Sequence, residues 1–436
     1  MSHSLSKCRV SAITIGRFVP ESLRRVHRVA LVLLAALSGG AACAAVHTDV
    51  MTAVKACEPE ARALLQTLVQ IDSGTADIPG VTAVGALLKS ELQRSGAEVG
   101  SVPATTGAAD NIVATVKGSG KGRLLVIAHM DTVFPHGTVA LRPYAVTGER
   151  GVGPGAGDDK SGVVLAVCAL RVLQQIRFHD FARITLIVNS NEETGSFGTR
   201  DLIRTQARQS DVAINLERGV PPDGLVIGRK GSAVITLEIT GHAAHAGLEP
   251  EKGRNAVIEA AQQALRLGTL ADPSRETTVN VTVIEGGNAT NVIPDHALLK
   301  ADVRAFTPEE FDRIEKALQE LAANPSVPDV QVHAQLARSF PPWPRATSTD
   351  ALLARAQQLY AEIGGTLTGI VVGSSADVAL AAETGTPAID GVGIRGGGAH
   401  GPEDYADLSS IVPRVYLLSR MLMDLGRDPA LATRKH

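Results

Sequence analysis

The apolar and polar positions of this chain form two successive patterns. Up to about residue 227, short apolar runs such as 124–128 and 184–188 alternate with stretches of helical periodicity such as 81–95 and 161–175. Short apolar runs bounded by polar residues are typical of buried strands, and their alternation with helices is typical of an α/β domain. We therefore predict an α/β fold with a mostly parallel sheet flanked by helices.

The pattern changes after this point. The following segments read as strand, helix, strand, strand, helix, strand, at residues 232–240, 255–267, 278–285, 297–305, 308–323 and 327–337. This order is that of the ferredoxin-like (βαββαβ) arrangement. We predict an inserted domain of this kind, after which the helical run 350–363 returns the chain to the first domain.

Side chains of the types that can bind a metal ion follow three of the predicted strands and occupy two glycine-rich turns. They are His129, Asp158, Glu193, Glu217 and His400, with Glu192 next to Glu193. Two neighbouring glutamates repel each other, so a site that keeps both favours a nearby cation. Histidine nitrogen and carboxylate oxygen are ligands of zinc, and a zinc pair that shares one carboxylate needs about five protein ligands. The sequence therefore predicts two zinc ions per subunit.

Asp131 follows His129 by two residues. We expect its carboxylate to accept the hydrogen bond from the imidazole nitrogen that does not face the metal, which would fix the tautomer of the ring.

Each of these residues, taken alone, has an ordinary explanation. His129 fits the end of a buried strand, the adjacent glutamates fit a solvated turn, and Asp158 fits a helix N-cap. Their joint occurrence in several segments favours a functional site.

Four segments resemble the M20 family of zinc metallopeptidases, and within it the glutamate carboxypeptidases. They are residues 129–133, 157–162, 191–196 and 398–400, and they occur in the family's order and at similar spacing. The resemblance implies that Asp158 bridges two zinc ions, with His129 and Glu217 on one ion and Glu193 and His400 on the other. It further implies that Glu192 is the general base and that the bond between Asp158 and Asp159 is cis.

The resemblance also implies roles for residues outside the metal segments. His245 matches a position from which related dimers donate an imidazole to the partner's active site, where it stabilises an oxyanion. Asn291 and Arg304 match substrate-contacting positions. Arg338 and Ser375 are further candidates for binding a substrate carboxylate, to which a guanidinium group is well suited.

Two departures from the family pattern concern the substrate. Glutamate carboxypeptidases usually carry a Gly-Gly-x-Thr/Ser-Asp stretch, whereas this chain has Ala376 between Ser375 and Asp377. Glutamate specificity is therefore left open. Arg218 follows Glu217 where related chains often have proline, and it adds a positive charge beside the predicted metal site.

Composition and charge are those of a globular enzyme. The 436 residues are 44% hydrophobic but only 3% aromatic, so the cores must be built mainly from aliphatic side chains. Residues 1–45 carry a net charge of +5, which leaves −8 for the remainder of a chain whose net charge is −3. A domain of that charge has no bulk attraction for nucleic acid.

The first 45 residues read as a targeting segment. Arginines at 24, 25 and 28 precede the apolar run 29–37, and small residues follow through Ala45. This pattern is typical of a signal peptide and predicts a periplasmic or secreted protein, while the run is too short to span a membrane comfortably. Cys57 and Cys168 would then be the only cysteines of the mature chain. We interpret both as free thiols, although an oxidising compartment would permit a disulfide between them.

The domain prediction follows from these observations. Residues 1–45 form the signal peptide, residues 46–228 and 339–436 form the catalytic domain, and residues 229–338 form the lid or dimerisation domain. The predicted function is hydrolysis of the amide bond to a C-terminal amino acid in a small peptide or N-acyl amino acid, by a homodimer, with glutamate as one candidate for the released amino acid. The alternatives are an aminoacylase or N-deacylase on the same metals and a non-catalytic metal-binding relative.

Overall fold

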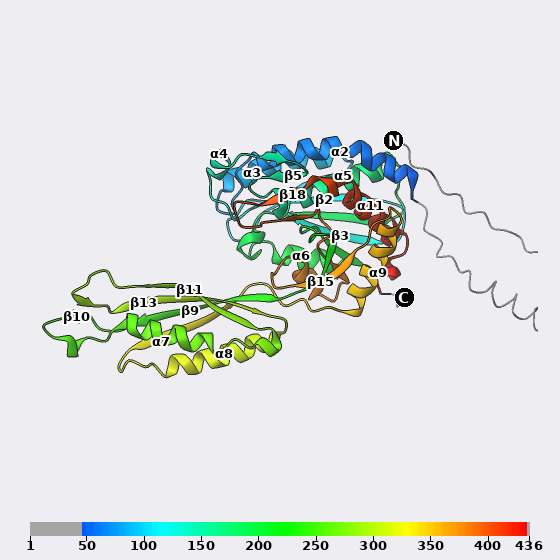
Figure 1. Cartoon of the computed structure of the whole chain (residues 1–436). Coiled ribbons are helices and arrows are strands. Elements are labelled where there is room, and N and C mark those ends of the chain that lie inside the picture. Colours follow the sequence, from blue (N-terminus) through cyan, green and yellow to red (C-terminus); the bar gives the residue numbers. More distant parts are fainter. Residues whose placement is uncertain (1–45, 434–436) are drawn as a thin grey trace, which may run out of the picture. The chain divides into compact units, whose positions relative to one another are not determined.

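The computed structural model describes residues 46–433, which form a larger domain and a lid (Figure 1). The predicted signal peptide lies outside the described residues. Among the described helices, none is long and apolar enough to cross a membrane.

The larger domain is built on a six-stranded mixed sheet with the order β1-β2-β6-β3-β7-β16. Strands β6, β3, β7 and β16 are parallel to one another. At one end of the sheet, β2 pairs antiparallel with β6 and β1 pairs antiparallel with β2. The strands are β1 Glu98–Val102, β2 Asn111–Lys117, β3 Arg123–His129, β6 Arg183–Asn189, β7 Val212–Asn215 and β16 Ala388–Ile389. The predicted α/β fold is confirmed.

Helices pack on both faces of this sheet. The first core contains residues from α2 Thr48–Val69, α3 Ile78–Arg94, α5 Ser161–Gln175, α9 Thr347–Ala361 and α11 Ile411–Arg427, and the second from α6 Arg200–Arg208 and α10 Val378–Ala382. In β3, Leu124 and Val126 belong to the first core and Leu125 and Ile127 to the second. Successive side chains of a strand point to opposite faces, so an unbroken apolar run is what a doubly covered strand requires.

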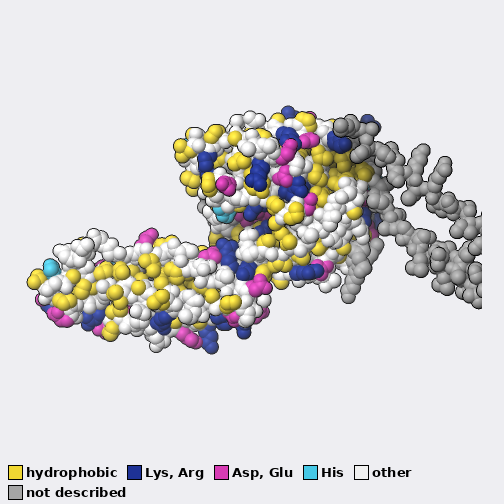
Figure 2. All heavy atoms as spheres, in the orientation of Figure 1, with side chains coloured by type: hydrophobic (Ala, Val, Ile, Leu, Met, Phe, Trp, Pro, Cys, Tyr) yellow, Lys and Arg dark blue, Asp and Glu magenta, His cyan; other side chains and the backbone are white. Residues whose placement is uncertain are grey.

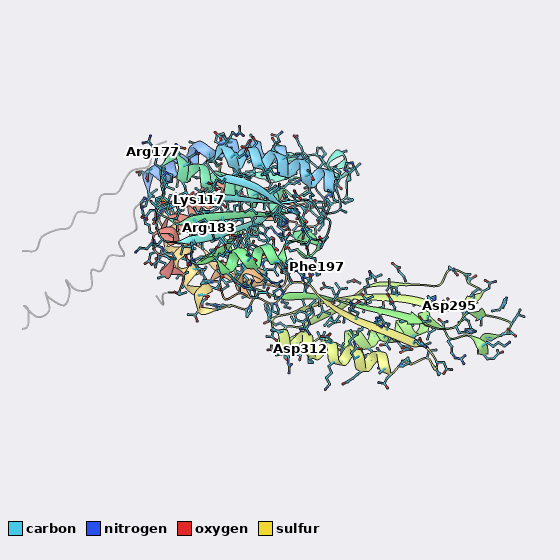
Figure 3. The ribbon with its side chains drawn as sticks, turned by 180° about the vertical axis from the view of Figure 1, so that it is seen from behind. Lys117, Arg177, Arg183, Phe197, Asp295 and Asp312 are labelled. Atoms are coloured by element: carbon cyan, nitrogen blue, oxygen red, sulfur yellow. A yellow bond between two sulfur atoms is a disulfide. The ribbon has the colours of Figure 1, made fainter. Side chains whose placement is uncertain are left out.

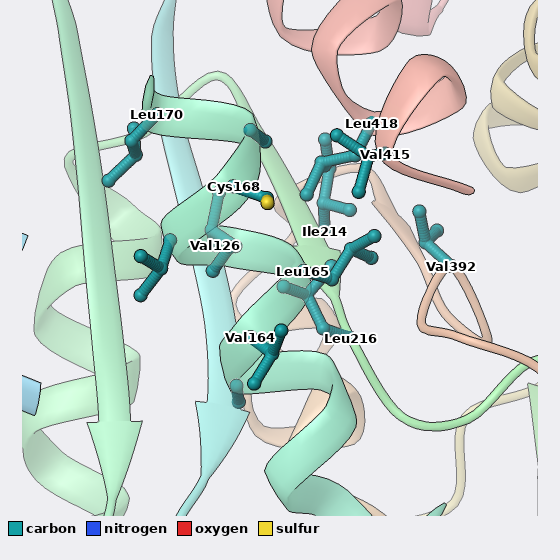
Figure 4. Packing of buried hydrophobic residues seen from close by; sticks show 14 of the residues in the cluster. Val126, Val164, Leu165, Cys168, Leu170, Ile214, Leu216, Val392, Val415 and Leu418 are labelled. Carbon is teal, nitrogen blue, oxygen red and sulfur yellow. The ribbon is translucent and has the colours of Figure 1, made fainter. Parts of the chain in front are cut away.

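Helix α5 lies at the centre of the first core. Its residues Val164, Leu165 and Cys168 pack among side chains of β3, β7 and α11 (Figure 4). Full burial of one such aliphatic side chain stabilises a fold by about 1.5–3 kcal/mol. Because α5 begins at Ser161, this packing fixes the turn that carries Asp158.

Smaller elements complete the larger domain. They are α4 Thr138–Leu141, β4 Ala145–Thr147, β5 Arg150–Val152, β8 Gly224–Arg229, β15 Thr368–Val372, β17 Gly396–Gly397 and β18 Tyr405–Asp407. Strands β17, β18, β5 and β4 form one antiparallel sheet, and β8 pairs in parallel with β15.

Cys57 and Cys168 form a disulfide, so the interpretation as free thiols is wrong. The two residues are 111 positions apart in sequence, and their Cα atoms lie 6.1 Å apart. The bond joins the buried faces of α2 and α5, which pack against each other. Sequence spacing does not reveal which faces of two distant helices meet, and this is why the pairing was missed.

The disulfide predicts a large effect on stability. The double variant C57A/C168A should lose about 3 kcal/mol of unfolding free energy, because closing so long a loop restricts the unfolded chain. Denaturant unfolding measures this loss. A thiol reductant should lower the unfolding midpoint of the original protein and leave that of the double variant unchanged. An unchanged unfolding midpoint in C57A/C168A would contradict the prediction.

The lid has the predicted ferredoxin-like order of elements. They are β9 Gly231–Thr240, α7 Ala256–Gly268, β11 Thr278–Gly286, β13 His296–Ala305, α8 Pro308–Ala323 and β14 Gln331–Arg338, with the short strands β10 Ala244–His245 and β12 Val292–Ile293. The four longer strands form an antiparallel sheet in the order β11-β13-β9-β14. Both helices cover the same face of it (Figure 1).

Many hydrophobic side chains remain on the lid surface (Figure 2). The large ones that are exposed are Val234, Leu248, Ile258, Leu265, Ile284 and Val292.

The two connections between the lid and the larger domain run side by side. Arg229 and Trp343 exchange two backbone hydrogen bonds, of 2.8 and 3.0 Å. Beyond them, the amide of Ser232 donates to Phe340 and its carbonyl accepts from Ser339. The chain therefore leaves the larger domain and returns to it at one place.

A buried carboxylate at the start of α8 predicts acid sensitivity of the lid. Glu310 accepts hydrogen bonds from Arg313, Arg275 and Thr277, and the bond from Arg313 is the main reason that its pKa falls to about 2. A lowered folded-state pKa gives stability that is present above about pH 4.5 and is lost as the pH falls through about 2. E310Q should therefore lose about 2 kcal/mol at pH 7 and much less near pH 2. Thermal unfolding at the two pH values measures this, and an equal loss at both would contradict it.

Candidate metal centre

Three neighbouring parallel strands bring most of the predicted ligands to one edge of the sheet. His129 is the last residue of β3, Glu193 follows β6 by four residues, and Glu217 follows β7 by two. Because β3 lies between β6 and β7 and is parallel to both, these three positions share the carboxyl edge. In open α/β sheets this edge is where ligands bind.

All five predicted ligands come together, and Asp158 lies between the other four. Its Oδ1 atom is 3.3 Å from His129 Nε2, which is itself 3.5 Å from Glu217 Oε1. Its Oδ2 atom is 3.7 Å from His400 Nε2, which is 3.1 Å from Glu193 Oε2. The two carboxylate oxygens of Asp158 therefore face two separate pairs of donors.

A tight glycine-rich turn presents Asp158. The amides of Gly155 and Gly157 donate to the buried carboxylate of Asp404, over 2.8 and 3.0 Å. Gly157 has no room for a side chain, because a Cβ atom there would lie 2.5 Å from the carbonyl oxygen of Tyr405. The peptide bond between Asp158 and Asp159 is cis, as the resemblance implied.

The carboxylate of Asp131 lies beside the imidazole of His129, as expected, but it also has other partners. The Nδ1 atom of His129 lies 3.0 Å from the main-chain carbonyl of Asp131 and 3.4 Å from its carboxylate. The carboxylate also accepts hydrogen bonds from the amides of Glu192 and Glu193, at 3.0 and 3.2 Å, and from the hydroxyl of Thr75. The imidazole is thus oriented mainly by the backbone, while the Asp131 side chain fixes the loop that carries both glutamates.

The carboxylates of this cluster are crowded and buried. Burial raises the pKa of Glu192 well above its usual range, and the charge of Glu217 adds to this. Burial likewise raises the pKa of Glu193. Burial opposes ionisation of Asp158 too, but the hydrogen bond with His129 and the charge of Arg218 outweigh it and hold the pKa of Asp158 below its usual value.

The donor set fits divalent zinc. It consists of imidazole nitrogen and carboxylate oxygen, and the candidate ligand atoms of His129, Asp158 and Glu193 lie within 4.8 Å of one another. Those of His129, Glu192 and Glu217 form a second such group. Cations bound among these atoms would relieve the repulsion between the carboxylates.

A cavity of about 580 Å³ opens from this cluster. Its walls include Asp158, Glu192, Glu193, Glu217 and His400, three arginines (Arg218, Arg229 and Arg304) and the serines Ser374 and Ser375. Arg304 pairs with Asp302 and donates over 3.2 Å to the hydroxyl of Ser375. Two of the predicted substrate-binding residues therefore lie in the cavity wall.

Arg229 is a further residue of this wall, and it was not predicted from the sequence. The side chain is buried, its Nε atom lies 2.6 Å from Asp390, and it donates over 2.7 Å to the hydroxyl of Ser374. A lone arginine at the end of the apolar segment 225–228 was the available signal.

Asp377 does not line the cavity, although its segment does. It is buried and accepts hydrogen bonds from Asn189 and Ser196 behind the glutamate loop. The serines of the same segment, Ser374 and Ser375, line the cavity instead.

Three further predicted residues are not among those that line the cavity. Arg338 lies at the end of β14 and pairs with Asp312 and Glu315 of α8, 2.6 and 2.7 Å away (Asp312 is labelled in Figure 3). The ring of His245 accepts hydrogen bonds from the amides of Gly247 and Leu248. The carbonyl of Asn291 accepts from the amide of Ala246, so His245 and Asn291 belong to one part of the lid. Their proposed roles remain predictions.

Family models match two regions of the chain. The model M20_dimer, described as a peptidase dimerisation domain, matches residues 227–330. A model of peptidase family M28 matches residues 111–259. The first match coincides with most of the lid, and the second includes four of the five candidate ligands.

The chain is also similar to individual proteins. It is 37% identical over 409 residues to carboxypeptidase G2 of Pseudomonas sp. (strain RS-16), an alignment that covers 92% of this chain and 98% of that protein. The fold is similar to that of a tripeptidase from Staphylococcus aureus, with a TM-score of 0.74, 23% identity and coverage of 85% and 99% of the two chains. It is similar as well to an M20 family metallo-carboxypeptidase from Sulfolobus solfataricus, with a TM-score of 0.67, 18% identity and coverage of 84% and 98%.

Proposed function

The chain belongs to the M20 family of metallopeptidases and is a hydrolase, and from this we propose that it uses two zinc ions to release a C-terminal amino acid from a small peptide or an N-acyl amino acid. The observation that carries the proposal is the position of Asp158, whose two oxygens face the pair His129 and Glu217 and the pair Glu193 and His400. A carboxylate in this position suits a bridging ligand.

The chemistry follows from the residues around this carboxylate. Divalent ions bound here would polarise the scissile carbonyl and acidify a water molecule. Glu192 takes a proton from the attacking water and delivers it to the leaving nitrogen. Burial raises the pKa of Glu192, and its loop is held by hydrogen bonds. Both support this role, because a more basic carboxylate takes a proton from water more readily.

The positive side chains of the cavity favour a substrate with a free carboxylate. In our proposal Arg304 and Ser375 contact the substrate, and the guanidinium groups of this wall suit a substrate carboxylate. The released amino acid is glutamate in the narrowest form of the proposal, which the similarity to carboxypeptidase G2 supports.

The same proposal includes a homodimer and an export route. The lid matches a dimerisation domain and exposes Leu248, Ile258 and Leu265, and His245 of the partner subunit would stabilise the oxyanion in each site. A periplasmic or secreted location is supported by the charge and hydropathy of residues 1–45 and by the disulfide, since disulfides persist in oxidising compartments.

A substrate panel tests the function. The protein, loaded with zinc, is assayed on dipeptides, on N-acyl amino acids and on folyl-type glutamates, with the released amino acid as the readout. We expect release that a chelator abolishes and that zinc restores. Release from N-acyl amino acids alone would instead indicate an aminoacylase, and bound zinc without hydrolysis of any member would contradict the proposal.

A further inference from the structure

Arg218 occupies a rigid position directly beside the candidate ligands. The residue before it, Glu217, accepts a hydrogen bond of 3.0 Å from the amide of Gly393, and the residue after it, Gly219, donates one of 3.1 Å to Ile394. On the opposite side the amide of Leu216 donates over 2.8 Å to Ile127 of β3. The backbone around Arg218 is therefore held between the central sheet and the segment 393–396.

The side chain of Arg218 extends along the cavity wall. Its NH1 atom lies 2.8 Å from Oδ2 of Asp158, and 29% of the side chain is exposed. The planar guanidinium therefore reaches the candidate metal cluster and still presents donors to the cavity.

The charges of the cavity distinguish Arg218 from the two other arginines in its wall. Arg229 is paired with Asp390, and Arg304 is paired with Asp302. Arg218 has Asp158 as its near partner, and this carboxylate is the one that the proposed function assigns to two cations.

The carboxylates of the candidate metal cluster can be compared in number with the charges of two bound cations. Asp158, Glu192, Glu193 and Glu217 are the acidic members of the cluster, and two divalent cations would neutralise four carboxylates. Arg218 would then share the carboxylate of Asp158 with the cations, whereas Arg229 and Arg304 keep carboxylate partners of their own.

We infer that Arg218 binds the free carboxylate of the substrate and sets the preference for substrates that have one. This inference rests on the proposed function. A guanidinium group binds both oxygens of a carboxylate through parallel hydrogen bonds, and such a pair is stronger than a neutral hydrogen bond. A carboxamide in the same place lacks the charge and one acceptor, so the site discriminates against it.

The test compares one substrate in two forms, as the free acid and as its C-terminal carboxamide. R218A should lower kcat/KM for the free acid about 10- to 100-fold, mainly through KM, and should change kcat/KM for the carboxamide by less than about 3-fold. The zinc content of R218A should equal that of the unchanged protein. R345A is the matched control, because Arg345 is exposed and pairs with Asp350 outside the cavity.

Two results would overturn the inference. One is an equal loss on both substrates together with a loss of zinc, which would mean that Arg218 serves to hold Asp158. The other comes from calorimetry of the zinc-loaded protein with the free amino acid, if R218A binds it as tightly as the unchanged protein does. Calorimetry needs no turnover, so it distinguishes a failure of this inference from a failure of the proposed hydrolysis.

Discussion

E192Q should lower kcat by about 10³-fold while both zinc ions remain bound. The glutamine side chain has nearly the same size and accepts hydrogen bonds, but it does not take a proton from water at neutral pH. The loop should keep its position, because Asp131 holds the main-chain amide of residue 192 and not its side chain. Steady-state kinetics and zinc analysis of the same preparation measure the two effects.

E403Q is the control for this variant. Glu403 is an exposed glutamate in the turn that carries His400, so the same chemical change is made close to the site but outside the cavity wall. E403Q should retain full activity. If E192Q keeps its activity per bound zinc, or if it loses zinc in proportion to activity, the role of general base is refuted.

D158N should remove the metal pair and the activity together. Asparagine has one neutral oxygen where Asp158 has two charged ones, and these two face separate pairs of donors. We expect no more than about one zinc ion per subunit and a fall in kcat/KM of about 10³-fold, since the cations contribute several kcal/mol to the transition state. Zinc analysis after dialysis and kinetics at saturating zinc measure both quantities.

D201N is the matched control for D158N, because the side chain of Asp201 is 96% exposed. It should bind zinc and turn over substrate like the unchanged protein. Two tightly bound zinc ions in D158N would show that this aspartate is not the bridge.

Much of the fold could be predicted from the sequence, because the burial of a strand or helix determines its pattern of apolar and polar residues. The strand β3 is apolar at every position from Leu124 to Ala128, and it is covered on both faces. The lid strands instead alternate, and their sheet has its helices on one face. Both patterns were read correctly, since local periodicity reflects how many faces of an element are covered.

The candidate ligands come together as the sequence predicted, because the carboxyl ends of neighbouring parallel strands meet at one edge of the sheet. Other contacts between side chains that are far apart in the sequence were not predicted. The pairing of Cys57 with Cys168, the contacts of Arg338 with α8 and the hydrogen bonds of Asp131 each depend on which side chains packing brings together. Residue types and their spacing do not show which distant side chains come into contact in the folded chain.

The paired connections of the lid have a consequence for engineering. Since Arg229 and Trp343 already hydrogen-bond to each other, the residues between them can be exchanged as one cassette with a single junction to match. A tight reverse turn in place of that cassette would remove Arg304 and the exposed apolar side chains of the lid, but it would leave all five candidate metal ligands in the larger domain.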